Sequence, residues 1–475
     1  MCAAETVYSM QITKTRFAPS PTGLIHIGNA RTALFSALCG TQFLLRIEDT
    51  DTERSRPEFV DSLLDDLRWL GLDWSEGPTS SEPVPAWFQS QRGAIYKAYY
   101  DQLEAQGLAY PCFCSPSELE ISRKVQLAAG KPPRYSGKCA HLNRDDISLK
   151  RGQGLQPTLR FRVPKQHMLS FEDGVRGQQK FLSDDIGDFI IRRADGTAAF
   201  FFCNAIDDAL MGVTQVLRGE DHLANTPRQI MLLEALGLPV PCYAHGSLIL
   251  GDDGAPLSKR NGSRSIAQLR EDGSFPLALV NMMARLGHHY DSDEFMSMAG
   301  LKAGFDLGHM GKSPARFDPV HLEHWQTLAV RSADDVTLER WLHPETRNLV
   351  PESHRADFIE IVRSNCLFPD QADRWARILF SDEMVIEYDA ATAATDAGES
   401  FFLAAIDAAH AAGSDFKAFM DQLKGQTGAK GKLLFMPLRA AFTGRHDGPD
   451  LATLYRVINP HRLQRRLAEF SYPSE

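Results

Sequence analysis

The 475-residue sequence lacks the long apolar run that would indicate a membrane protein. No stretch approaches the roughly 20 consecutive apolar residues that a membrane-spanning helix needs. The N-terminal segment, MCAAETVYSMQITKTRF, also lacks a basic region followed by an apolar core, so it does not resemble a secretory signal. We therefore expect a cytoplasmic protein.

The sequence also lacks the cysteine pattern of a secreted scaffold and the positive charge of a typical nucleic-acid-binding domain. Eight cysteines in a chain of this length do not form a disulfide framework. The net charge of −10 argues only weakly against nucleic-acid binding, because local basic patches decide such binding. Hydrophobic residues (43%) and charged residues (24%) are in an ordinary globular balance. The length predicts about three domains.

The first part of the chain alternates predicted strands and helices. Apolar residues suit strands over residues 14–18 and 43–47, and apolar residues at helical spacing predict helices over 29–38 and 59–70. This alternation indicates an α/β fold with a parallel, doubly wound sheet.

A region of mixed structure interrupts this pattern from about residue 112 to about residue 202. It is rich in turns and in short strand-like segments, such as residues 159–163 and 188–193. The alternating pattern resumes near Asp207. The segments expected after it are a strand over 212–217, a helix over 226–236, a strand within 239–250, and helices from residue 275 onward.

Residues 19–29, PSPTGLIHIGN, lie between a predicted strand and a predicted helix. The first turn of a helix has unpaired N–H groups and the positive end of the helix dipole, so it attracts anions. Gly28 lets a ligand approach the backbone closely, and His26 can donate to a phosphate oxygen. Ligands of open α/β sheets bind at this edge. We therefore expect a phosphate site; the alternative is an ordinary strand–helix turn with a capping histidine.

A second loop, residues 251–262 (GDDGAPLSKRNG), is predicted to lie at the surface because of its glycines and proline. Lys259 is a mobile positive charge suited to a polyphosphate whose charge grows in the transition state. The alternative is a solvated basic loop, since lysine–arginine pairs are common in loops. The functional interpretation therefore depends on the pairing of this loop with the first motif.

Together, HIGN at residues 26–29 and PLSKR at residues 256–260 resemble the two signature motifs of class I aminoacyl-tRNA synthetases, whose usual short forms are HIGH and KMSKS. The resemblance extends from about residue 13 to about residue 470, and it is to the bacterial glutamyl-tRNA synthetases. PSPTG with RIEDTD is specific to the glutamyl/glutaminyl branch. The segments that carry the resemblance are TRFAPSPTG, ARTALF, FLLRIEDTD, LRWLGLDW, RGEDHLANTPRQI, KSPARFD and KGKLLFMPLRAAFTG.

The resemblance implies a ligase that activates glutamate with ATP and attaches it to a transfer RNA. It implies a Rossmann-type doubly wound parallel-sheet catalytic domain with a mixed zinc-binding insertion, followed by an all-α anticodon-binding region. The expected segments are residues 1–110 and 206–255 for the two halves of the catalytic domain, 111–205 for the insertion that holds the tRNA acceptor end, 256–325 for a stem-contact region with the LSKR loop, and 326–475 for the helical anticodon-binding domain.

Three cysteines and a histidine form two tight pairs: Cys112 with Cys114, and Cys139 with His141. Three thiolates and an imidazole suit a closed tetrahedral zinc site. Such a site leaves no position for a substrate, so we expect one structural Zn²⁺. Some bacterial members of the family carry zinc at this spacing. The alternative is three buried free cysteines and a surface histidine.

A pocket for glutamate needs guanidinium groups for the side-chain carboxylate, ideally in bidentate contact. Arg16, just before the first motif, and Arg218, at the end of a predicted strand, are the candidates. Glu48, at another strand end, suits the α-amino group. The alternative for either arginine is an ordinary ion pair, such as Arg218 with Asp221.

By resemblance, the glutamate-binding positions are Arg16, Ser20, Glu48, Asn204 and Arg218. The positions expected to bind ATP, as its Mg²⁺ complex, are Ser20, Thr22, His26, Gly28, Asn29, Ser258, Lys259 and Arg260. Of these, His26 and Lys259 are expected to be catalytic.

The chain departs from the usual family pattern at three positions. The family usually has glycine where Asn29 stands, and lysine where Pro256 opens the second motif, so the loop carries less positive charge here. A tyrosine expected near the glutamate pocket is Phe200, which lacks the hydroxyl.

The predicted helical tail is expected to bind the anticodon, and residues 312–314 to contact the tRNA stem. Phosphate contacts would supply most of the affinity, and unpaired bases would be recognised by stacking and by hydrogen bonds to their edges. The alternative is a solvated helical surface. The basic residues of the tail are Lys424, Lys430, Lys432, Arg439, Arg445, Arg456, Arg462, Arg465 and Arg466.

Three rival interpretations remain at this point. A glutaminyl enzyme shares the chemistry, but that branch resembles β-barrels where this chain is predicted to be helical. A shorter relative that glutamylates a modified base lacks such a tail. A catalytically silent RNA-binding protein is the rival of another class, and intact His26 and Lys259 argue against it. The sequence leaves open whether tRNA-Gln is charged beside tRNA-Glu. The family expectation is a monomer.

Overall fold

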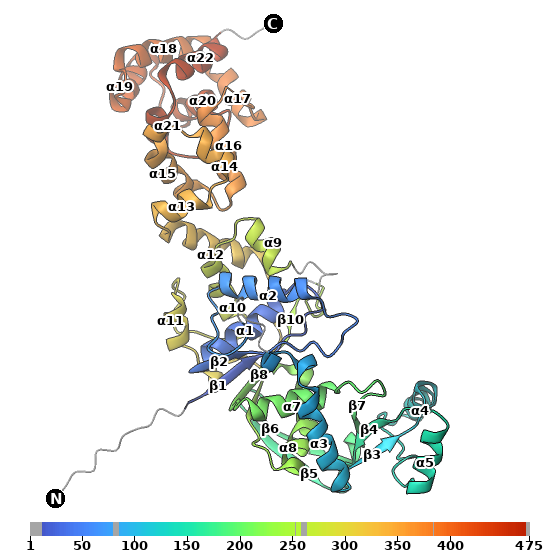
Figure 1. Ribbon diagram of the computed structural model, residues 1–475. Helices are drawn as coiled ribbons and strands as arrows, with labels where there is room; N and C mark the ends of the chain where they lie inside the picture. Colours follow the sequence, from blue (N-terminus) through green and yellow to red (C-terminus); the bar gives the residue numbers. More distant parts are fainter. Residues whose placement is uncertain (1–11, 79–84, 252, 258–263, 383, 472–475) are drawn as a thin grey trace, which may run out of the picture. The chain divides into compact units, whose positions relative to one another are not determined.

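The computed structural model describes residues 12–78, 85–251, 253–257, 264–382 and 384–471 (Figure 1). They divide into two compact units. The first unit contains the residues up to Leu269 together with Leu279–Pro319, and the second contains Arg270–Ala278 together with the residues from Val320 onward. None of the helices in these ranges is long and apolar enough to span a bilayer.

The first unit begins with a βαβ repeat whose two strands are parallel. β1 (Lys14–Phe17) pairs with β2 (Gln42–Leu45) in parallel, and α1 (Ile27–Cys39) connects them. The alanine and leucine residues of α1 favour helix and are mostly buried, so this helix is fixed by its core face as well as by propensity. These elements agree with the strands and helix predicted near them.

A second βαβ repeat stands beside the first. β8 (Gln215–Gly219) pairs in parallel with β9 (Cys242–Gly246), and α8 (Thr226–Leu236) connects them. α8 ends where Gly237 adopts a left-handed conformation (φ 66°), which glycine does at little cost. The backbone N–H of Thr214 donates to Lys14 O at 2.9 Å, so β1 and β8 are neighbours. The carboxyl ends of both strands therefore open onto one edge, where ligands of such sheets bind.

The region of mixed structure contains two small sheets. β3 (Ala109–Cys112), β4 (Thr158–Phe161) and β7 (Phe189–Arg192) form an antiparallel sheet. β5 (Met168–Asp173) and β6 (Gly177–Leu182) form a hairpin, and β5 also pairs in parallel with β9. Part of the insertion is therefore built into the sheet that carries β8 and β9.

The structure corrects the expectation of turns and short strands in this region, because the region also contains helices. α4 (Pro116–Ala128) and α5 (Arg144–Gly152) have no buried residues, so no apolar periodicity marked them. Each begins with a capping box, which is the signal that identifies them in retrospect. α7 (Phe200–Leu210) is buried almost throughout, so it also lacks a two-sided pattern.

The remaining elements of the first unit complete its core and carry the chain to the second unit. The division between the units falls within α9 and α10. These elements are α2 (Pro57–Trp69), α3 (Gly93–Ala105), α6 (Ser183–Ile186), η3 (Glu220–Asn225), β10 (Ile249–Leu250), α9 (Ile266–Glu271), α10 (Pro276–Arg285), α11 (Met298–Ala303) and β11 (Ala315–Arg316).

The second unit is helical throughout its described residues (Figure 1). Its core contains Phe358, Phe402, Phe419 and Phe442. The helices are α12 (Pro319–Ser332), α13 (Asp335–Trp341), α14 (Pro344–Leu349), α15 (Arg355–Asn365), α16 (Pro369–Phe380), α17 (Tyr388–Ala397), α18 (Glu399–Ala412), α19 (Phe416–Thr427), α20 (Lys432–Thr443), α21 (Leu451–Val457) and α22 (Pro460–Ser471). An α/β part with parallel strands followed by an all-helical part confirms the predicted fold class.

One basic residue of the tail has a structural role. Arg466 is buried and donates to the carbonyl oxygens of Phe442 and Ile378, near the ends of α20 and α16. It therefore satisfies carbonyl groups that a helix end leaves unpaired. Its side chain is not part of a surface that RNA could contact.

Candidate active site and metal centre

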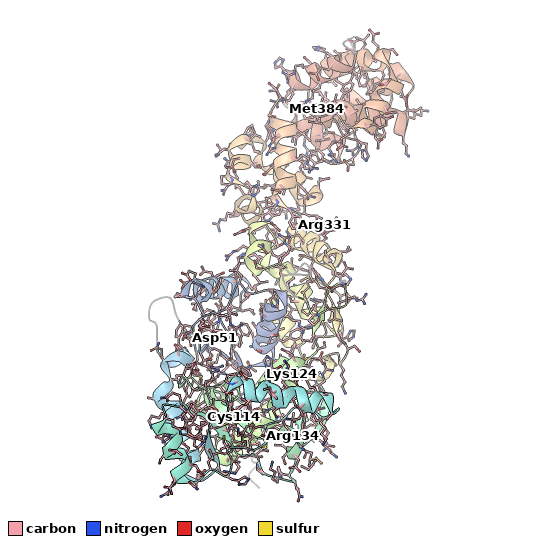
Figure 2. The ribbon with its side chains drawn as sticks, turned by 90° about the vertical axis from the view of Figure 1, so that its right-hand side faces the viewer. Asp51, Cys114, Lys124, Arg134, Arg331 and Met384 are labelled. Carbon is pink, nitrogen blue, oxygen red and sulfur yellow. The ribbon has the colours of Figure 1, made fainter. Side chains whose placement is uncertain are left out.

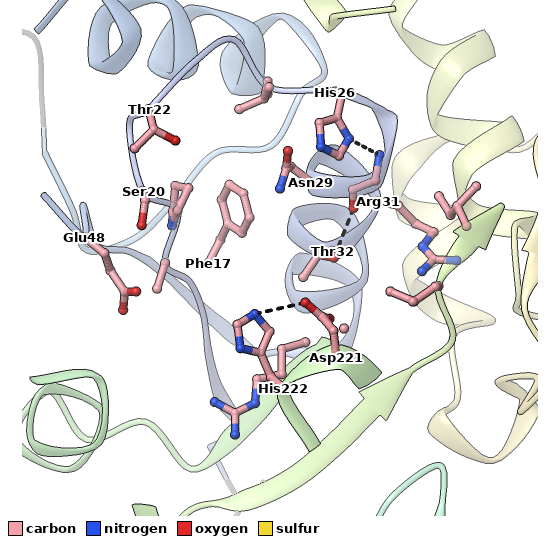
Figure 3. Close-up of a pocket in the computed structure, with 18 of the residues that line it drawn as sticks. Phe17, Ser20, Thr22, His26, Asn29, Arg31, Thr32, Glu48, Asp221 and His222 are labelled. Atoms are coloured by element: carbon pink, nitrogen blue, oxygen red, sulfur yellow. Dashed lines mark hydrogen bonds and ion pairs between the residues drawn. The ribbon is translucent and has the colours of Figure 1, made fainter. Parts of the chain in front are cut away.

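A cavity of about 600 Å³ opens at the carboxyl ends of β1 and β8 (Figure 3). In Figure 3, Ser20 and Thr22 lie on the segment after β1, and His26 and Asn29 lie at the start of α1. Within the described chain, the residues predicted to bind ATP or glutamate all line this cavity: Arg16, Ser20, Thr22, His26, Gly28, Asn29, Glu48, Asn204 and Arg218. Ser258, Lys259 and Arg260 lie outside the described residues, although Pro256 and Leu257 line the cavity.

The start of α1 has the geometry expected for a capped helix. His26 is the N-cap residue, and its Nδ1 accepts a hydrogen bond from Gly28 N–H at 3.1 Å. The capping histidine that the sequence offered as an alternative is therefore present, and it uses the Gly28 N–H. A Cβ atom at position 28 would lie 3.0 Å from Cε1 of the His26 ring, so a larger residue would require the imidazole to shift slightly. Capping through Nδ1 places the imidazole on the wall of the cavity.

Two arginines share one buried carboxylate at the base of the cavity. Arg16 Nε lies 3.2 Å from Asp208 Oδ1, and Arg46 Nη1 lies 2.7 Å from the same atom. Arg46 Nη2 also contacts Glu48 Oε1 at 3.1 Å. Burial alone would raise the pKa of Asp208, but Arg16 and Arg46 hold it below its ordinary value. Arg16 is thus in an ion pair, the alternative that the sequence offered for it, whereas Asp208 was not singled out from the sequence.

Glu48 connects this cluster to the opposite wall. Its Oε1 accepts from Asn204 Nδ2 at 2.6 Å, and Asn204 Oδ1 accepts from Gln229 Nε2 at 2.7 Å. Burial raises the pKa of Glu48, although Arg46 and Asn204 oppose this effect. A carboxylate with only part of its hydrogen-bonding capacity used, next to a cavity, suits a positively charged ligand group.

Arg218 is buried on the other wall, and its partners are neutral. Its Nη2 donates to Thr226 Oγ1 at 2.8 Å and to Gln229 Oε1 at 2.7 Å, and its Nε donates to His245 Nε2 at 3.1 Å. The ion pair with Asp221 that the sequence offered as an alternative is absent among the described residues, where Asp221 contacts His222 at 3.6 Å instead. Arg218 therefore faces the cavity with a charge that no adjacent carboxylate neutralises.

The sequence did not identify several residues that hold this site together. Thr226 and Gln229 lie on α8, and His245 lies on β9, so all three are buried in ordinary secondary structure. Their only signal is a polar residue inside an otherwise apolar element, which usually has a partner. Arg46 was noted only as the first residue of the RIEDTD segment.

The three departures from the usual pattern all line the cavity. Phe200 packs its ring against His222, with centroids 5.4 Å apart. Asn29 is exposed at the start of α1, and Pro256 is exposed before the undescribed loop residues. The hydroxyl that tyrosine would add at position 200 would therefore lie beside a titratable imidazole.

The cysteines of the predicted zinc site are gathered in the structure. The Sγ atoms of Cys112, Cys114 and Cys139 all lie within 4.8 Å of one another. The Tyr135 hydroxyl lies 3.4 Å from Cys112 Sγ and 3.5 Å from Cys114 Sγ, and it accepts from Cys139 N–H at 2.9 Å. His141 is exposed and lies outside this group. The structure thus presents three thiols and a phenol at the expected place.

The electrostatics of this cluster suit a cation. Burial would raise the pKa of Cys112, but hydrogen bonds with Tyr135 and Arg160 lower it to about 7. Burial raises the pKa of Cys114 to about 11, and the neighbouring thiols add to this effect. A divalent cation would remove the repulsion among the thiolates, and thiolate ligands favour zinc. Figure 2 shows Cys114 near α4, the helix that carries Lys124.

A cavity at the carboxyl ends of parallel strands, beside a capped helix start, is the ligand-binding position of doubly wound α/β proteins. Residues 12–324 match the model described as tRNA synthetases class I (E and Q), catalytic domain, and residues 337–471 match the anticodon binding domain. The chain therefore belongs to the glutamate and glutamine family of class I tRNA synthetases.

Relatives in this family match the chain over nearly its whole length. It is 67% identical over 466 residues to glutamate–tRNA ligase 1 of Methylococcus capsulatus, a match that covers 98% of this chain and 100% of the relative. It is 56% identical to glutamate–tRNA ligase 2 of Nitrosococcus oceani, over 96% of this chain and 97% of the relative. The crystal structure of a glutamate tRNA ligase from Elizabethkingia meningosepticum, in complex with its amino acid, is 26% identical with a TM-score of 0.86, and the match covers 97% of this chain and 99% of that chain.

Proposed function

We propose that this synthetase is a glutamate–tRNA ligase that converts L-glutamate and ATP to glutamyl-adenylate and transfers glutamate to the 3′-terminal ribose of tRNA-Glu. The observation that carries the proposal is the pair of arginines, Arg16 and Arg218, in the lining of one cavity that Glu48 also lines. The two cations suit the carboxylates of glutamate, and Glu48 suits its α-amino group. The relatives with 67% and 56% identity bear the same activity in their names.

The first step is mainly positioning and charge stabilisation. The α-carboxylate of glutamate attacks the α-phosphate of ATP, and pyrophosphate leaves. The cavity wall at Ser20, Thr22 and Asn29 supplies polar groups for the nucleotide, and His26 is positioned by its cap. Lys259 is proposed to neutralise the leaving pyrophosphate, with Mg²⁺ bound to ATP. The terminal ribose hydroxyl of tRNA then attacks the mixed anhydride and displaces AMP, without a side-chain nucleophile.

The experiment for the proposed function is aminoacylation with radiolabelled glutamate, Mg-ATP, and tRNA-Glu or tRNA-Gln in separate reactions. Labelling of tRNA-Glu alone would support a discriminating enzyme. Labelling of both would support a non-discriminating enzyme that needs a downstream amidation partner. Charging of tRNA-Gln with glutamine would favour the glutaminyl rival, and no labelling by the folded protein would favour the silent RNA-binding rival.

The role of Lys259 is tested in the same reaction. Lys259→Ala should raise the barrier to adenylate formation by about 3 kcal/mol, the usual cost of removing one group that stabilises developing charge. The control is Lys97→Ala, because Lys97 is exposed and contacts only Asp101 in an i,i+4 pair. Glutamate-dependent ATP–pyrophosphate exchange, measured in the presence of tRNA-Glu, distinguishes the two variants. Near wild-type exchange by Lys259→Ala would remove this residue from the mechanism.

We also propose one structural Zn²⁺ held by Cys112, Cys114 and Cys139. Metal analysis of the purified protein should give one zinc per chain, and Cys139→Ser should abolish it. His141→Ala and Tyr135→Phe decide the fourth ligand, because only the variant that removes a ligand should weaken zinc retention against a chelator. Loss of zinc by neither variant would leave water or a tRNA group as the fourth ligand.

The remaining expectations on partners and location stay predictions. The second unit is proposed to bind the tRNA anticodon, as the matched domain suggests. The monomeric state is checked by size-exclusion chromatography with light scattering, and the cytoplasmic location by cell fractionation. The five-segment division of the chain also stays a prediction.

A further inference from the structure

Arg218 is held by neutral groups that act only as acceptors toward it. Three acceptors receive its Nε and Nη2 hydrogens: His245 Nε2, Thr226 Oγ1 and Gln229 Oε1. The guanidinium also lies over the ring of Tyr243, at 5.3 Å from the centroid. Arg218 lines the cavity, and its Nη1 is buried and has no hydrogen-bond partner within the described part of the chain. The side chain is thus fixed at three hydrogens, while Nη1 remains for a ligand.

The buried carboxylate of Asp173 determines which nitrogen of His245 accepts a hydrogen bond. Arg218 Nε can only donate, so His245 Nε2 must present its lone pair and Nδ1 must carry the proton. His245 Nδ1 lies 2.5 Å from Asp173 Oδ2, and both side chains are fully buried. Burial lowers the pKa of His245, although the hydrogen bond with Asp173 opposes this effect and the charge of Arg218 adds to it. Asp173 therefore selects the tautomer that Arg218 requires.

The carboxylate of Glu48 determines in the same way that the amide oxygen of Gln229 faces Arg218. Glu48 accepts from Asn204 Nδ2, so Asn204 Oδ1 faces Gln229 Nε2 and Gln229 Oε1 faces Arg218. Two chains of hydrogen bonds thus lead to Arg218, one from Asp173 through His245 and one from Glu48 through Asn204 and Gln229. In each chain the carboxylate fixes the orientation of the polar groups that follow it.

This arrangement differs from an ion pair in one functional respect. A carboxylate in direct contact would neutralise Arg218 and compete with an anionic ligand. Neutral acceptors hold the guanidinium in place and leave its charge available, and the low-polarity surroundings strengthen its attraction for an anion. Burial lowers the pKa of Arg218 to about 10, which still leaves it charged at neutral pH.

We propose that Asp173 and His245 are positioning residues that aim Arg218 at the side-chain carboxylate of the amino-acid substrate, and that this aim sets the preference for glutamate over glutamine. The inference rests on the proposed function, because it takes glutamate as the substrate. Neither residue lines the cavity, so neither contacts the substrate itself.

The test uses Asp173→Asn, which preserves shape and inverts the hydrogen bonds. Asp173 Oδ1 accepts from the backbone N–H groups of Val175, Arg176 and His245 at 2.8–3.1 Å. The carbonyl oxygen of asparagine would take this position, and its NH₂ group would then face His245 Nδ1. The imidazole would have to carry its proton on Nε2, where it would oppose Arg218 Nε–H.

In aminoacylation of tRNA-Glu, we expect Asp173→Asn to raise the KM for glutamate about 10- to 100-fold, the usual effect of losing a hydrogen bond to a charged group. The KM for ATP should stay within about twofold of the wild-type value, because the nucleotide wall of the cavity is untouched. The ratio of kcat/KM for glutamate over glutamine should fall by a similar factor.

Two further variants and one control separate the loss of Arg218 orientation from general damage to the fold. His245→Leu should match Asp173→Asn, whereas His245→Gln should recover most of the glutamate affinity because its amide oxygen can accept from Arg218. The matched control is Asp188→Asn, a buried carboxylate that accepts from Tyr110 and Val163 at the insertion and does not line the cavity. It should leave the glutamate KM unchanged.

The outcomes that overturn the inference are specific. A glutamate KM within about twofold of wild type in Asp173→Asn, or equal rises in the KM values for glutamate and ATP, would make the pair merely structural. Equal effects of His245→Gln and His245→Leu would also overturn it. A wild-type protein that charges no tRNA with glutamate would instead contradict the proposed function, and the inference would fall with it.

Discussion

The two βαβ repeats of the catalytic unit each end a strand with a buried arginine, and they compensate its charge in opposite ways. Arg46, which follows β2, is 0% exposed and directly contacts the carboxylates of Asp208 and Glu48. Arg218, in β8, is 5% exposed, and among the described residues its hydrogen bonds go to neutral acceptors. The first arginine is neutralised and serves the fold. The second keeps its charge and is available to a ligand.

The largest effect should come from removing a carboxylate that neutralises Arg46. Asp208→Asn would leave Arg16 and Arg46 without their shared charge in a buried site, so we expect a loss of about 3–5 kcal/mol in the free energy of unfolding. Urea unfolding followed by circular dichroism measures it. The control, Asp51→Asn, removes an exposed partner of Arg54 and should cost little. A small loss in Asp208→Asn would mean that the two arginines are solvated in the folded protein.

A change at Arg218 should alter ligand binding rather than stability. Arg218→Lys keeps the charge and loses the planar fork, so we expect a loss of about 1.5–3 kcal/mol in glutamate binding, seen as a rise in KM. The melting temperature should change little, because lysine can still donate to the neutral acceptors. The control is Arg228→Lys on the same helix as Gln229, since Arg228 donates to Ala224 O and does not line the cavity. A large drop in stability without a KM effect would erase the contrast between the two arginines.

Acid should weaken the unit through both carboxylates. Burial alone would raise the pKa of Asp208 and of Asp173, but Arg16 and Arg46 lower the first and the hydrogen bond from His245 lowers the second. Each therefore stabilises the fold above the unfolded pKa of about 3.9, and this stability is lost as pH falls through the lower folded pKa.

Unfolding measured across this acid range sharpens the comparison. Every unit of lowering contributes about 1.4 kcal/mol above pH ~4, so Asp208→Asn should show a shallower decline with falling pH than the wild type. A decline of equal slope in both proteins would assign the acid sensitivity to other carboxylates.

The smallest effect concerns Phe200, which lines the same cavity as Arg218. Phe200→Tyr would add a hydroxyl near His222, with which the ring is already in contact. We expect the KM for glutamate to fall by no more than a few-fold, about 0.5–1 kcal/mol, because one neutral hydrogen bond contributes little net energy. Steady-state kinetics with glutamate as the varied substrate checks this. A rise in KM would show that the phenylalanine fits this pocket better.

Much of the catalytic fold follows from local signals. The helix over residues 226–236 was predicted with the bounds that α8 has, because it begins at Thr226-Pro227 and ends before Gly237. The turn after β1 was also predicted, although α1 begins at Ile27, two residues before its predicted start. Some candidate residues of the cavity came from their chemistry and position and the rest from family resemblance, and the structure brings the described ones together without testing what they bind.

The residues that were missed depend on contacts distant in sequence. Asp208 lies on α7, where polar and apolar positions are buried alike, and its partners Arg16 and Arg46 are 192 and 162 residues away. Asp173 and His245 are 72 residues apart, on a hairpin strand and a core strand. No periodicity marks such pairs, because each becomes favourable only when the tertiary fold supplies the other charge or donor.

The parallel pairing of Asp173 with Tyr243 makes part of the insertion inseparable from the catalytic sheet. Residues 111–205 interrupt the α/β pattern in sequence, so they invite treatment as an exchangeable cassette. A chimera that replaced them with the insertion of another synthetase would also replace the acid behind His245. Phe200 and Asn204 also lie within this range and line the cavity, so grafting at that boundary would alter the amino-acid pocket as well.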